Sequence, residues 1–466
     1  GWRCCGLGCL ERERKGKRSM REGGLEAPRR NPIDWTSAEF HDLDALDREM
    51  RRVFDICHSC RRCYRLCDSF PRLFELIDGS PTGELDSVDS SGFKRVVDAC
   101  TLCDICFMAS CPYVPPHEFN VDFPHLMLRY RAAHLRREGA GFGERLITET
   151  DRNGRMGCRV ASLANWALDT GNRLTRPVME RVAGVDRGAE LPRYQSRTLV
   201  EQASGAAPPV NREAPAFGRK AVLYATCYGN YNGPSIGLAA RAVLARNGVE
   251  TAVVHPSCCG MPQLEQGDLA RVAEHARTVM RNLLGWVDKG FDVIALVPSC
   301  ALMLKFEWPL ILPGDSDVAR LAGATFDVAE YVVGIAVKEG LAPGLKPLDA
   351  PVTLHIACHA RAQNMGRKAA ELLGLVPEAR LTVIERCSGH GGSWGARKGN
   401  FETALKVGRP VARQAQDAGR AYLASECPLA GAHIRQGMER LAVELGGQPP
   451  TAALHPIELF ARAYGL

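Results

Sequence analysis

Short apolar runs alternate with helix-length amphipathic stretches in the second half of the chain. Six runs have strand length, and they start at Ala221, Val253, Val293, Pro351, Val383 and Ala421. The last three follow the first three at a nearly constant offset of about 130 residues, with matching local sequence. This period predicts a duplicated open-sheet α/β domain, which we place at residues 219–347 and 348–466.

A cysteine follows each of the six runs. The first repeat contains Cys227, Cys258, Cys259 and Cys300, and the second contains Cys358, Cys387 and Cys427. Because the carboxyl ends of strands in an open parallel sheet meet at one edge, each set is expected to converge there. Four thiols in the first repeat suffice for an iron–sulfur cluster or a zinc ion. In the second repeat, Ser388 replaces one cysteine, so the site either recruits His359 or His390 or is an eroded copy.

In the N-terminal half, apolar residues at helical spacing predict helices at residues 70–77 and 93–97. Two groups of thiols flank these stretches, at Cys57, Cys60, Cys63 and Cys67 and at Cys100, Cys103, Cys106 and Cys111. Three cysteines spaced by two residues wrap one face of an iron–sulfur cubane, and a fourth further along completes a neighbouring cluster. We therefore predict a mainly α, helical two-cluster ferredoxin-like domain at residues 31–138.

The crossed ligand pattern assigns each cysteine to one of two [4Fe–4S] clusters. Cys57, Cys60, Cys63 and Cys111 are expected to bind the first, and Cys67, Cys100, Cys103 and Cys106 the second. Asp68 rather than proline follows Cys67, and four residues rather than three separate Cys106 from Cys111. Both changes alter a turn without removing a ligand. Two zinc sites are the alternative, since Cys-x2-Cys pairs also bind zinc.

A basic amphipathic helical segment is predicted at residues 139–199, followed by a Pro/Ala-rich linker at 200–218. Met156, Val160, Leu163 and Ala167 follow helical spacing, with Trp166 beside them and several arginines around them. The preferred interpretation is a surface helix that packs this stripe on the ferredoxin-like domain. The alternative is peripheral contact with an anionic membrane or a partner subunit.

Composition narrows the class of protein. The chain has 466 residues, 45% hydrophobic and 24% charged, with no apolar run long enough to predict a transmembrane helix. Of the formal charge of +6, residues 1–30 contribute nine Lys/Arg against four Asp/Glu, so the remaining chain is nearly neutral and a nucleic-acid role has no support. We expect residues 1–30 to be a disordered basic leader or a misassigned start. Nineteen clustered cysteines in a long chain without a secretory signal indicate metal rather than disulfides.

Several sequence motifs resemble those of the cysteine-rich "CCG" domains of heterodisulfide reductases and of the family of anaerobic glycerol-3-phosphate dehydrogenase C subunits. They are Cys258-Cys-Gly-Met-Pro262 with Glu265 and Gly267-Asp268, Cys358-His359 with Gln363 and Gly366, and Cys387-Ser-Gly-His-Gly-Gly. Met303 and Ala430 depart from the family's pattern, which has a second cysteine at each of these positions. The resemblance implies an iron–sulfur subunit that takes electrons from a flavoprotein dehydrogenase partner towards a membrane quinone, located in the cytoplasm or on the inner face of the plasma membrane.

The sequence is also compatible with two other functions. One is a disulfide reductase acting at Cys258 and Cys259, and the other is a zinc-stabilised scaffold without turnover. Neither a dinucleotide fingerprint nor a phosphate loop is found after a predicted strand. Substrate oxidation is therefore expected on another polypeptide, whether the donor is glycerol 3-phosphate or a hydroxy acid.

Overall fold

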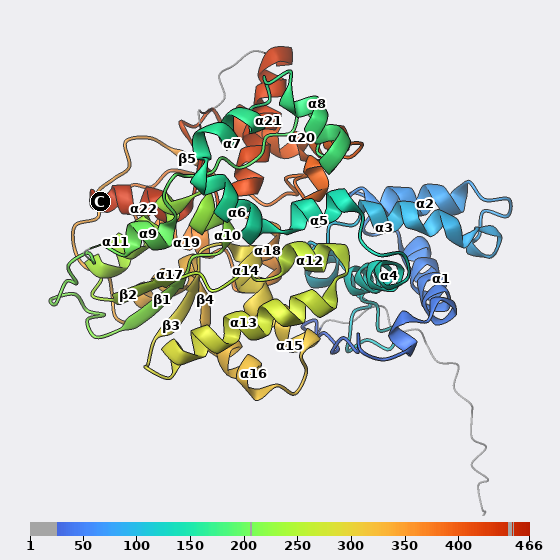
Figure 1. Ribbon diagram of the computed structural model, residues 1–466, viewed down its shortest axis with the longest axis horizontal. Helices are drawn as coiled ribbons and strands as arrows, with labels where there is room; N and C mark the ends of the chain where they lie inside the picture. Colours follow the sequence, from blue (N-terminus) through green and yellow to red (C-terminus); the bar gives the residue numbers. More distant parts are fainter. Residues whose placement is uncertain (1–25, 206, 446–449, 451) are drawn as a thin grey trace, which may run out of the picture.

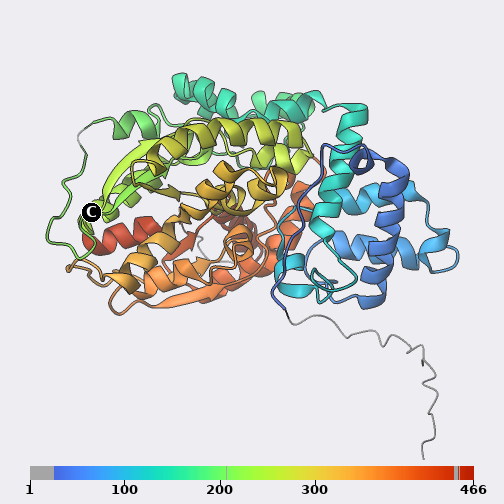
Figure 2. The ribbon, with the colours of Figure 1, turned by 90° about the horizontal axis from the view of Figure 1, so that it is seen from below.

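The computed structural model describes residues 26–205, 207–445, 450 and 452–466 (Figure 1). A helical N-terminal domain lies beside a larger body built on two parallel sheets, as the two views show (Figures 1 and 2). The α/β class with a mainly helical N-terminal region is confirmed. Most of the predicted leader lies outside the described residues, but its end is packed on the helical domain, where the Arg29 amide donates to the Pro115 carbonyl (3.0 Å).

Four helices make up the N-terminal domain. They are α1 (Leu43–Cys60), α2 (Ser69–Asp78), α3 (Phe93–Ala99) and α4 (Phe123–Glu138). Helix α1 begins where the Asp42 carboxylate accepts a hydrogen bond from the Ala45 amide (2.6 Å), and it buries Leu46, Met50, Val53 and Phe54 at helical spacing. The extra residue between Cys106 and Cys111 is absorbed in a π-helical turn, Cys106–Ser110, closed by the Cys111 amide on the Cys106 carbonyl (2.8 Å).

An arm of short helices follows and crosses the outside of the body. It consists of α5 (Phe142–Thr148), α6 (Thr150–Arg159), α7 (Ala161–Leu168) and α8 (Thr175–Ala183), and α9 (Leu199–Ala203) comes after it. The interpretation that its apolar stripe packs on the ferredoxin-like domain is wrong. Met156, Val160, Leu163 and Trp166 are all more than half exposed.

Small residues form the inner face of the arm instead. A Cβ atom at Gly154 would lie 2.2 Å from the Tyr231 ring, and one at Gly157 would lie 2.5 Å from the Tyr194 ring. The neighbouring Cys158 thiol lies 3.6 Å from the Tyr231 carbonyl oxygen. The arm therefore approaches the body through its glycines, and this close contact turns the larger apolar side chains outward.

The first repeat is an open parallel sheet with strand order β2-β1-β3-β4. Its strands are β1 (Lys220–Tyr224), β2 (Glu250–Val254), β3 (Asp292–Ala295) and β4 (Thr325–Asp327). Its helices are α10 (Cys227–Tyr231), α11 (Pro234–Arg246), α12 (Met261–Gln266), α13 (Leu269–Val287), α14 (Pro298–Leu302), α15 (Trp308–Ile311), α16 (Ser316–Gly323) and α17 (Val328–Lys338), with a π-helical turn at Met303–Glu307.

The second repeat has the corresponding order, β6-β5-β7-β8, again with all strands parallel. Its strands are β5 (Val352–His355), β6 (Leu381–Ile384), β7 (Tyr422–Ser425) and β8 (Ala453–Leu454). Its helices are α18 (Cys358–Ala362), α19 (Lys368–Gly374), α20 (Phe401–Ala418), α21 (Pro428–Leu445) and α22 (Pro456–Tyr464). The duplicated topology is confirmed, although the short edge strands β4 and β8 were not predicted because neither forms an apolar run of useful length.

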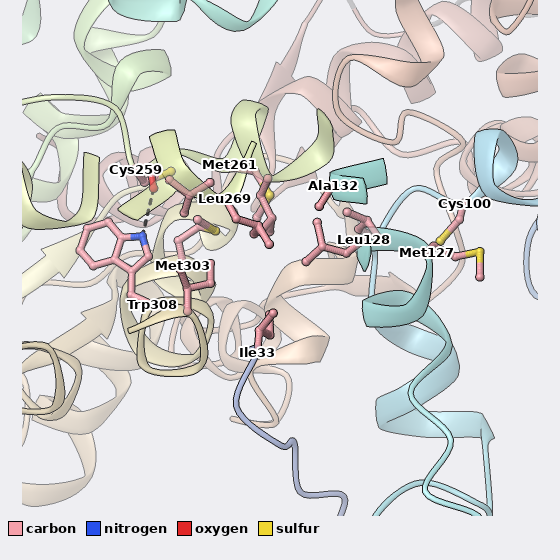
Figure 3. Close-up of a cluster of buried hydrophobic side chains, with 14 of the residues drawn as sticks. Ile33, Cys100, Met127, Leu128, Ala132, Cys259, Met261, Leu269, Met303 and Trp308 are labelled. Atoms are coloured by element: carbon pink, nitrogen blue, oxygen red, sulfur yellow. Dashed lines mark hydrogen bonds between the residues drawn. The ribbon is translucent and has the colours of Figure 1, made fainter. Parts of the chain in front are cut away.

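Buried side chains connect the three parts. One core joins the N-terminal helices to the first repeat, with Leu128 and Ala132 of α4 facing Met261 and Leu269, while Met127 lies on the side of α4 near Cys100 (Figure 3). A second core joins the outer sides of both repeats, including α11, α17, α19 and α22. Since the cores cross the predicted boundaries, the three parts pack as one body. Within the described residues, no helix is long and apolar enough to cross a bilayer.

Candidate iron–sulfur sites

The first group of N-terminal thiols lines a small cavity at the end of α1. Its cysteines are Cys57, Cys60, Cys63 and Cys111, the four expected to bind the first cluster. Arg61 ends the helix in a left-handed conformation (φ 50°), which turns the chain so that Cys63 comes back towards Cys57. Burial, together with the neighbouring thiols of Cys111, Cys63 and Cys60, raises the pKa of Cys57. Four thiolates here would repel one another unless a cationic group lay between them.

The second group lies directly beside the first. Its members are Cys67, Cys100, Cys103 and Cys106, and the pKa of Cys106 is raised by burial and by the proximity of Cys103, Cys100, Cys67 and also Cys63 of the first group. Leu102 and Asp104, which flank Cys103, both adopt positive φ angles of 50° and 64°. This bent loop is the backbone feature that gathers Cys100, Cys103 and Cys106 around one point.

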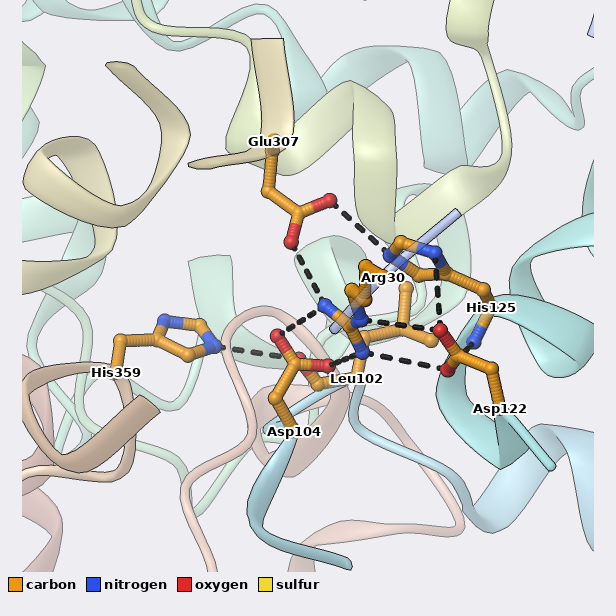
Figure 4. Close-up of polar contacts among 7 residues, drawn as sticks. All are labelled: Arg30, Leu102, Asp104, Asp122, His125, Glu307 and His359. Carbon is orange, nitrogen blue, oxygen red and sulfur yellow. Dashed lines mark hydrogen bonds and ion pairs between the residues drawn. The ribbon is translucent and has the colours of Figure 1, made fainter. Parts of the chain in front are cut away.

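Arg30 clamps this loop to the rest of the molecule (Figure 4). Its guanidinium donates to Asp104 (2.6 and 3.0 Å), to Asp122 (3.1 and 3.4 Å) and to Glu307 (3.0 Å). It also stacks over the Phe107 ring at 4.6 Å. These residues come from the chain start, the cysteine loop, the start of α4 and the first repeat. No sequence pattern pointed to this cluster, because its members lie far apart in the chain.

His125 completes the cluster by contacting the second carboxylate oxygen of Glu307, the one that Arg30 does not bind. Its ring lies 3.2 Å from Glu307 and 3.4 Å from Asp122. Burial and Arg30 act to lower the pKa of His125, but Asp122 and Glu307 outweigh them and raise it. Burial acts to raise the pKa of Glu307, but His125 and Arg30 outweigh it and lower that pKa to about 2. Three carboxylates therefore share one arginine and one readily protonated histidine.

The four thiols of the first repeat meet at the carboxyl ends of β1, β2 and β3, as the strand pattern predicted. The Cys259 and Cys300 sulfurs are 3.2 Å apart. Cys227 hydrogen bonds to Cys258, which raises the pKa of Cys227 and lowers that of Cys258. The Cys258 amide donates to the Asp151 carboxylate (2.7 Å), which also contacts His255 (2.7 Å). Asp151 comes from the arm, so the arm orders the double-cysteine turn.

The backbone beside Cys227 is strained. Thr226 is fully buried and has φ 59° and ψ 165°, a region that residues other than glycine rarely occupy. Its hydroxyl accepts a hydrogen bond from the Gly229 amide (3.1 Å), which starts α10. In the second repeat, Ala357 takes the matching place with ordinary angles of −68° and 148°. The strain is thus confined to the repeat that retains four thiols.

These donor sets fit an iron–sulfur group in their chemistry, since thiolates are the ligands such clusters take. Within the described part of the chain, no three His, Cys, Asp or Glu side chains are already arranged around a single metal ion.

The three cysteines of the second repeat do not form one site. Cys358 and Cys387 line a cavity with Cys67 and Cys103 of the N-terminal domain, whereas Cys427 lines a different cavity with Cys300. Hydrogen bonding from Cys358 lowers the pKa of Cys103, and the same contact raises that of Cys358. This departs from the expectation of a three-thiol site. The reason is tertiary, because the cysteine loop of the N-terminal domain packs against Cys358, Cys387 and His359.

The two histidines considered as extra ligands also lie apart. His359 uses both ring nitrogens, one on the Ser299 hydroxyl (2.8 Å) and one on the Leu102 carbonyl (3.3 Å; Figure 4), so it holds the cysteine loop. His390 follows the tight turn at Ser388–Gly389 and packs against His433, with ring centroids 5.9 Å apart. His433 was missed by sequence analysis, since a lone histidine in a helix carries no spacing signal.

The chain is similar in sequence to several known proteins. The sequence profile of the CCG family, described as a cysteine-rich domain, matches residues 221–305 and 352–435. The chain is 26% identical over 285 residues to the C subunit of anaerobic glycerol-3-phosphate dehydrogenase from Escherichia coli K12, covering 60% of this chain and 70% of that protein. Over 255 residues it is 25% identical to the B subunit of fumarate reductase (CoM/CoB) from Methanothermobacter marburgensis, covering 53% and 47%. Over 256 residues it is 24% identical to the D subunit of dihydromethanophenazine:CoB–CoM heterodisulfide reductase from Methanosarcina barkeri, covering 53% and 59%.

Proposed function

We propose that this chain, which carries two CCG cysteine-rich domains, is an iron–sulfur electron-transfer subunit of a multi-subunit oxidoreductase. It would take electrons from a flavoprotein dehydrogenase of the glycerol-3-phosphate or hydroxy-acid type and pass them towards a membrane quinone. Iron–sulfur clusters supply one-electron transfer when bound. The protein's own residues hold, bury and hydrogen bond the thiolates, and these contacts tune the redox potential.

The observation that carries this proposal is the continuity of the thiol groups. The first group neighbours the second through Cys63 and Cys106, and the second meets the second repeat through Cys103 and Cys358. In our proposal, Cys57, Cys60, Cys63 and Cys111 bind one [4Fe–4S] cluster and Cys67, Cys100, Cys103 and Cys106 bind another. Cys227, Cys258, Cys259 and Cys300 are the candidates for a third centre.

The disulfide-reductase alternative is supported by one observation, namely that Cys258 and Cys259 line a cavity of ligand size. The divided thiols of the second repeat count against a paired site of this kind.

We also propose that the arm places the chain at the cytoplasmic membrane surface. Its outward face carries Met156, Val160, Leu163, Trp166, Leu174, Val178 and Val182, all exposed. Exposed arginines lie among them at Arg152, Arg155, Arg159, Arg173 and Arg181. Apolar side chains bordered by cationic ones, with a tryptophan, suit the interface of an anionic bilayer.

Iron and acid-labile sulfide analysis of anaerobically purified protein tests the relay. Two clusters give about eight irons and eight sulfides per chain, and a clear excess would indicate a third centre in the first repeat. Cys103→Ser is expected to remove about half of the N-terminal iron. Cys158→Ser is the matched control, because this buried thiol lies on α6 away from the N-terminal thiols, and it should leave iron unchanged. Colourless protein that contains zinc and no labile sulfide would overturn the proposal.

The partner is tested by affinity purification from the native host under anaerobic conditions. A flavin-containing dehydrogenase in the isolated complex is expected, and its absorption spectrum identifies it. Isolation of a chain that reduces disulfides unaided would instead favour the reductase alternative.

A further inference from the structure

A cavity of about 340 Å³ lies between the two CCG domains. Its walls are mainly apolar and include Met261, Val297, Phe401 and Leu429. At one side it meets the thiols of the first repeat, since Cys227, Cys258, Cys259 and Cys300 all line it. Its total size falls within the usual range of small-molecule sites. The proposed third centre would occupy the part of this volume beside the thiols. A ligand here would lie next to the proposed third centre.

Three histidines line this cavity, and His359 already uses both of its ring nitrogens, on Ser299 and Leu102. Both His390 and His433 line it, and within the described residues the Nε2 atom of each is buried without a hydrogen-bond partner. His433 is only 8% exposed. Buried polar atoms normally have a partner, so these two unpartnered nitrogens, on residues that line the cavity, are the candidate hydrogen-bond partners of a ligand.

Burial also keeps both imidazoles uncharged. It lowers the pKa of His433, and together with the proximity of the His433 imidazole it lowers the pKa of His390 to about 3. A neutral imidazole has one N–H donor and one lone-pair acceptor, so it can donate to a carbonyl or accept from a hydroxyl. The two histidines therefore suit a ligand whose oxygens interconvert between carbonyl and hydroxyl groups.

The lack of cationic side chains in the described part of the lining argues against anionic ligands. Among the described lining residues there is neither arginine nor lysine, and the charged side chains are Glu190 and Glu265. A phosphate or carboxylate ligand would lie in an apolar cavity without a cation to pair with, which is costly. A flat, uncharged, apolar ring with oxygen substituents fits this lining.

Residues that directly follow the arm form one wall of the cavity. Val185, Ala189, Leu191 and Pro192 line the cavity, and they come directly after α8, which exposes Val178 and Val182 and is preceded by the exposed Leu174. Along the chain, this wall therefore follows directly on the segment whose surface we assign to the membrane. The Gln436 side chain of α21 donates a hydrogen bond to the Gly188 carbonyl (2.7 Å), which fixes this segment to α21.

We propose that this cavity binds the ring of a membrane quinone, with His390 and His433 as the hydrogen-bond partners of its oxygens. The inference rests on the proposed relay function. The bound quinone takes two electrons, which originate in the reduced flavoprotein and arrive singly, and two protons, which come from water through the imidazoles. The product is the quinol, and no covalent bond to the protein forms.

Equilibrium dialysis of the full chain against 2,3-dimethyl-1,4-naphthoquinone tests this site. Both reactive ring carbons of this probe are methylated, so it does not alkylate cysteines. His433→Leu and His390→Leu are each expected to weaken binding roughly fivefold, as loss of one hydrogen bond would. His433→Gln should restore part of the affinity, because glutamine keeps both a donor and an acceptor. His134→Leu, a change on the surface of α4, should have no effect.

The same samples distinguish failure of this inference from failure of the relay. Iron and labile sulfide are measured beside each dialysis, and circular dichroism verifies that each variant is folded. Full iron content with no quinone binding, or equal binding by the native chain and both leucine variants, would overturn the quinone site and leave the relay intact. Absence of labile sulfide would overturn the relay, and the quinone inference with it.

Discussion

Arg30 Nη1 lies 3.0 Å from Glu307 Oε1, although 277 residues separate the two in sequence. Both side chains are largely buried, at 11% and 2% exposure. Glu307 lies in the π-helical turn that follows Cys300, while Arg30 also holds Asp104 beside Cys103. This pair therefore connects the two cysteine-bearing regions, and it fixes where the N-terminal thiols lie relative to the repeats.

Replacing Arg30 with methionine should destabilise the protein strongly. The change leaves Asp104, Asp122 and Glu307 without their shared cation, and breaking a buried ion cluster costs roughly 3–5 kcal/mol. Urea denaturation of the anaerobic protein measures the loss. Arg52→Met is the control, because Arg52 pairs with Glu49 at the surface, where such pairs contribute about 1 kcal/mol or less. Equal losses for both variants would contradict the assigned role.

His125 should make stability fall as the pH rises above neutral. Its pKa is raised in the folded state, so its contribution is complete below the usual value of 6.5 and is lost as the pH rises through the folded pKa. Glu307, with a pKa near 2, stays ionised throughout this range. Thermal melts between pH 6 and 9 should show the decline, and His125→Gln should flatten it. A profile that is unchanged by the substitution would contradict this prediction.

Gly408→Ala should destabilise the turn that carries His390. A Cβ atom at Gly408 in α20 would lie 2.2 Å from the Ser388 carbonyl oxygen, and overpacking of this kind costs roughly 1–3 kcal/mol. Gly285→Ala is the matched control within α13, since nothing lies within 4 Å of its Cβ position. This control should stabilise by roughly 0.5–1 kcal/mol through helix propensity. Melting temperatures compare the two, and a stabilised Gly408 variant would contradict the close contact.

Leu163→Ser with Trp166→Ser should weaken binding to anionic vesicles at least tenfold. Burying one large apolar side chain contributes roughly 1.5–3 kcal/mol, and about 1.4 kcal/mol corresponds to a factor of ten. Flotation with phosphatidylglycerol vesicles at low salt measures binding, and higher salt should reduce it by screening the arginines. Val337→Ser, at another exposed apolar position on α17, should change nothing. Absence of flotation by the native chain would end the membrane proposal, and a protein partner for the arm would replace it.

Local pattern predicted the strands well and the orientation of surfaces poorly. The apolar runs that end at Cys227, Cys258 and Cys300 became β1, β2 and β3, because a buried parallel strand needs only a short continuous apolar segment. The stripe at Met156, Val160 and Leu163 was recognised as a helix face, but its period does not say whether that face meets protein or solvent. The glycines at 154 and 157 decided this, since they allow the opposite face to pack closely.

The sequence by itself determined the duplicated α/β domains, the helical N-terminal domain and the two spaced groups of thiols, because these depend on residue spacing within one element or one loop. Tertiary structure alone decided the division of Cys358 and Cys387 from Cys427, the Arg30 cluster and the cavity faced by His390 and His433. Each of these joins segments far apart in the chain, and only the packing of whole domains sets distances between such segments.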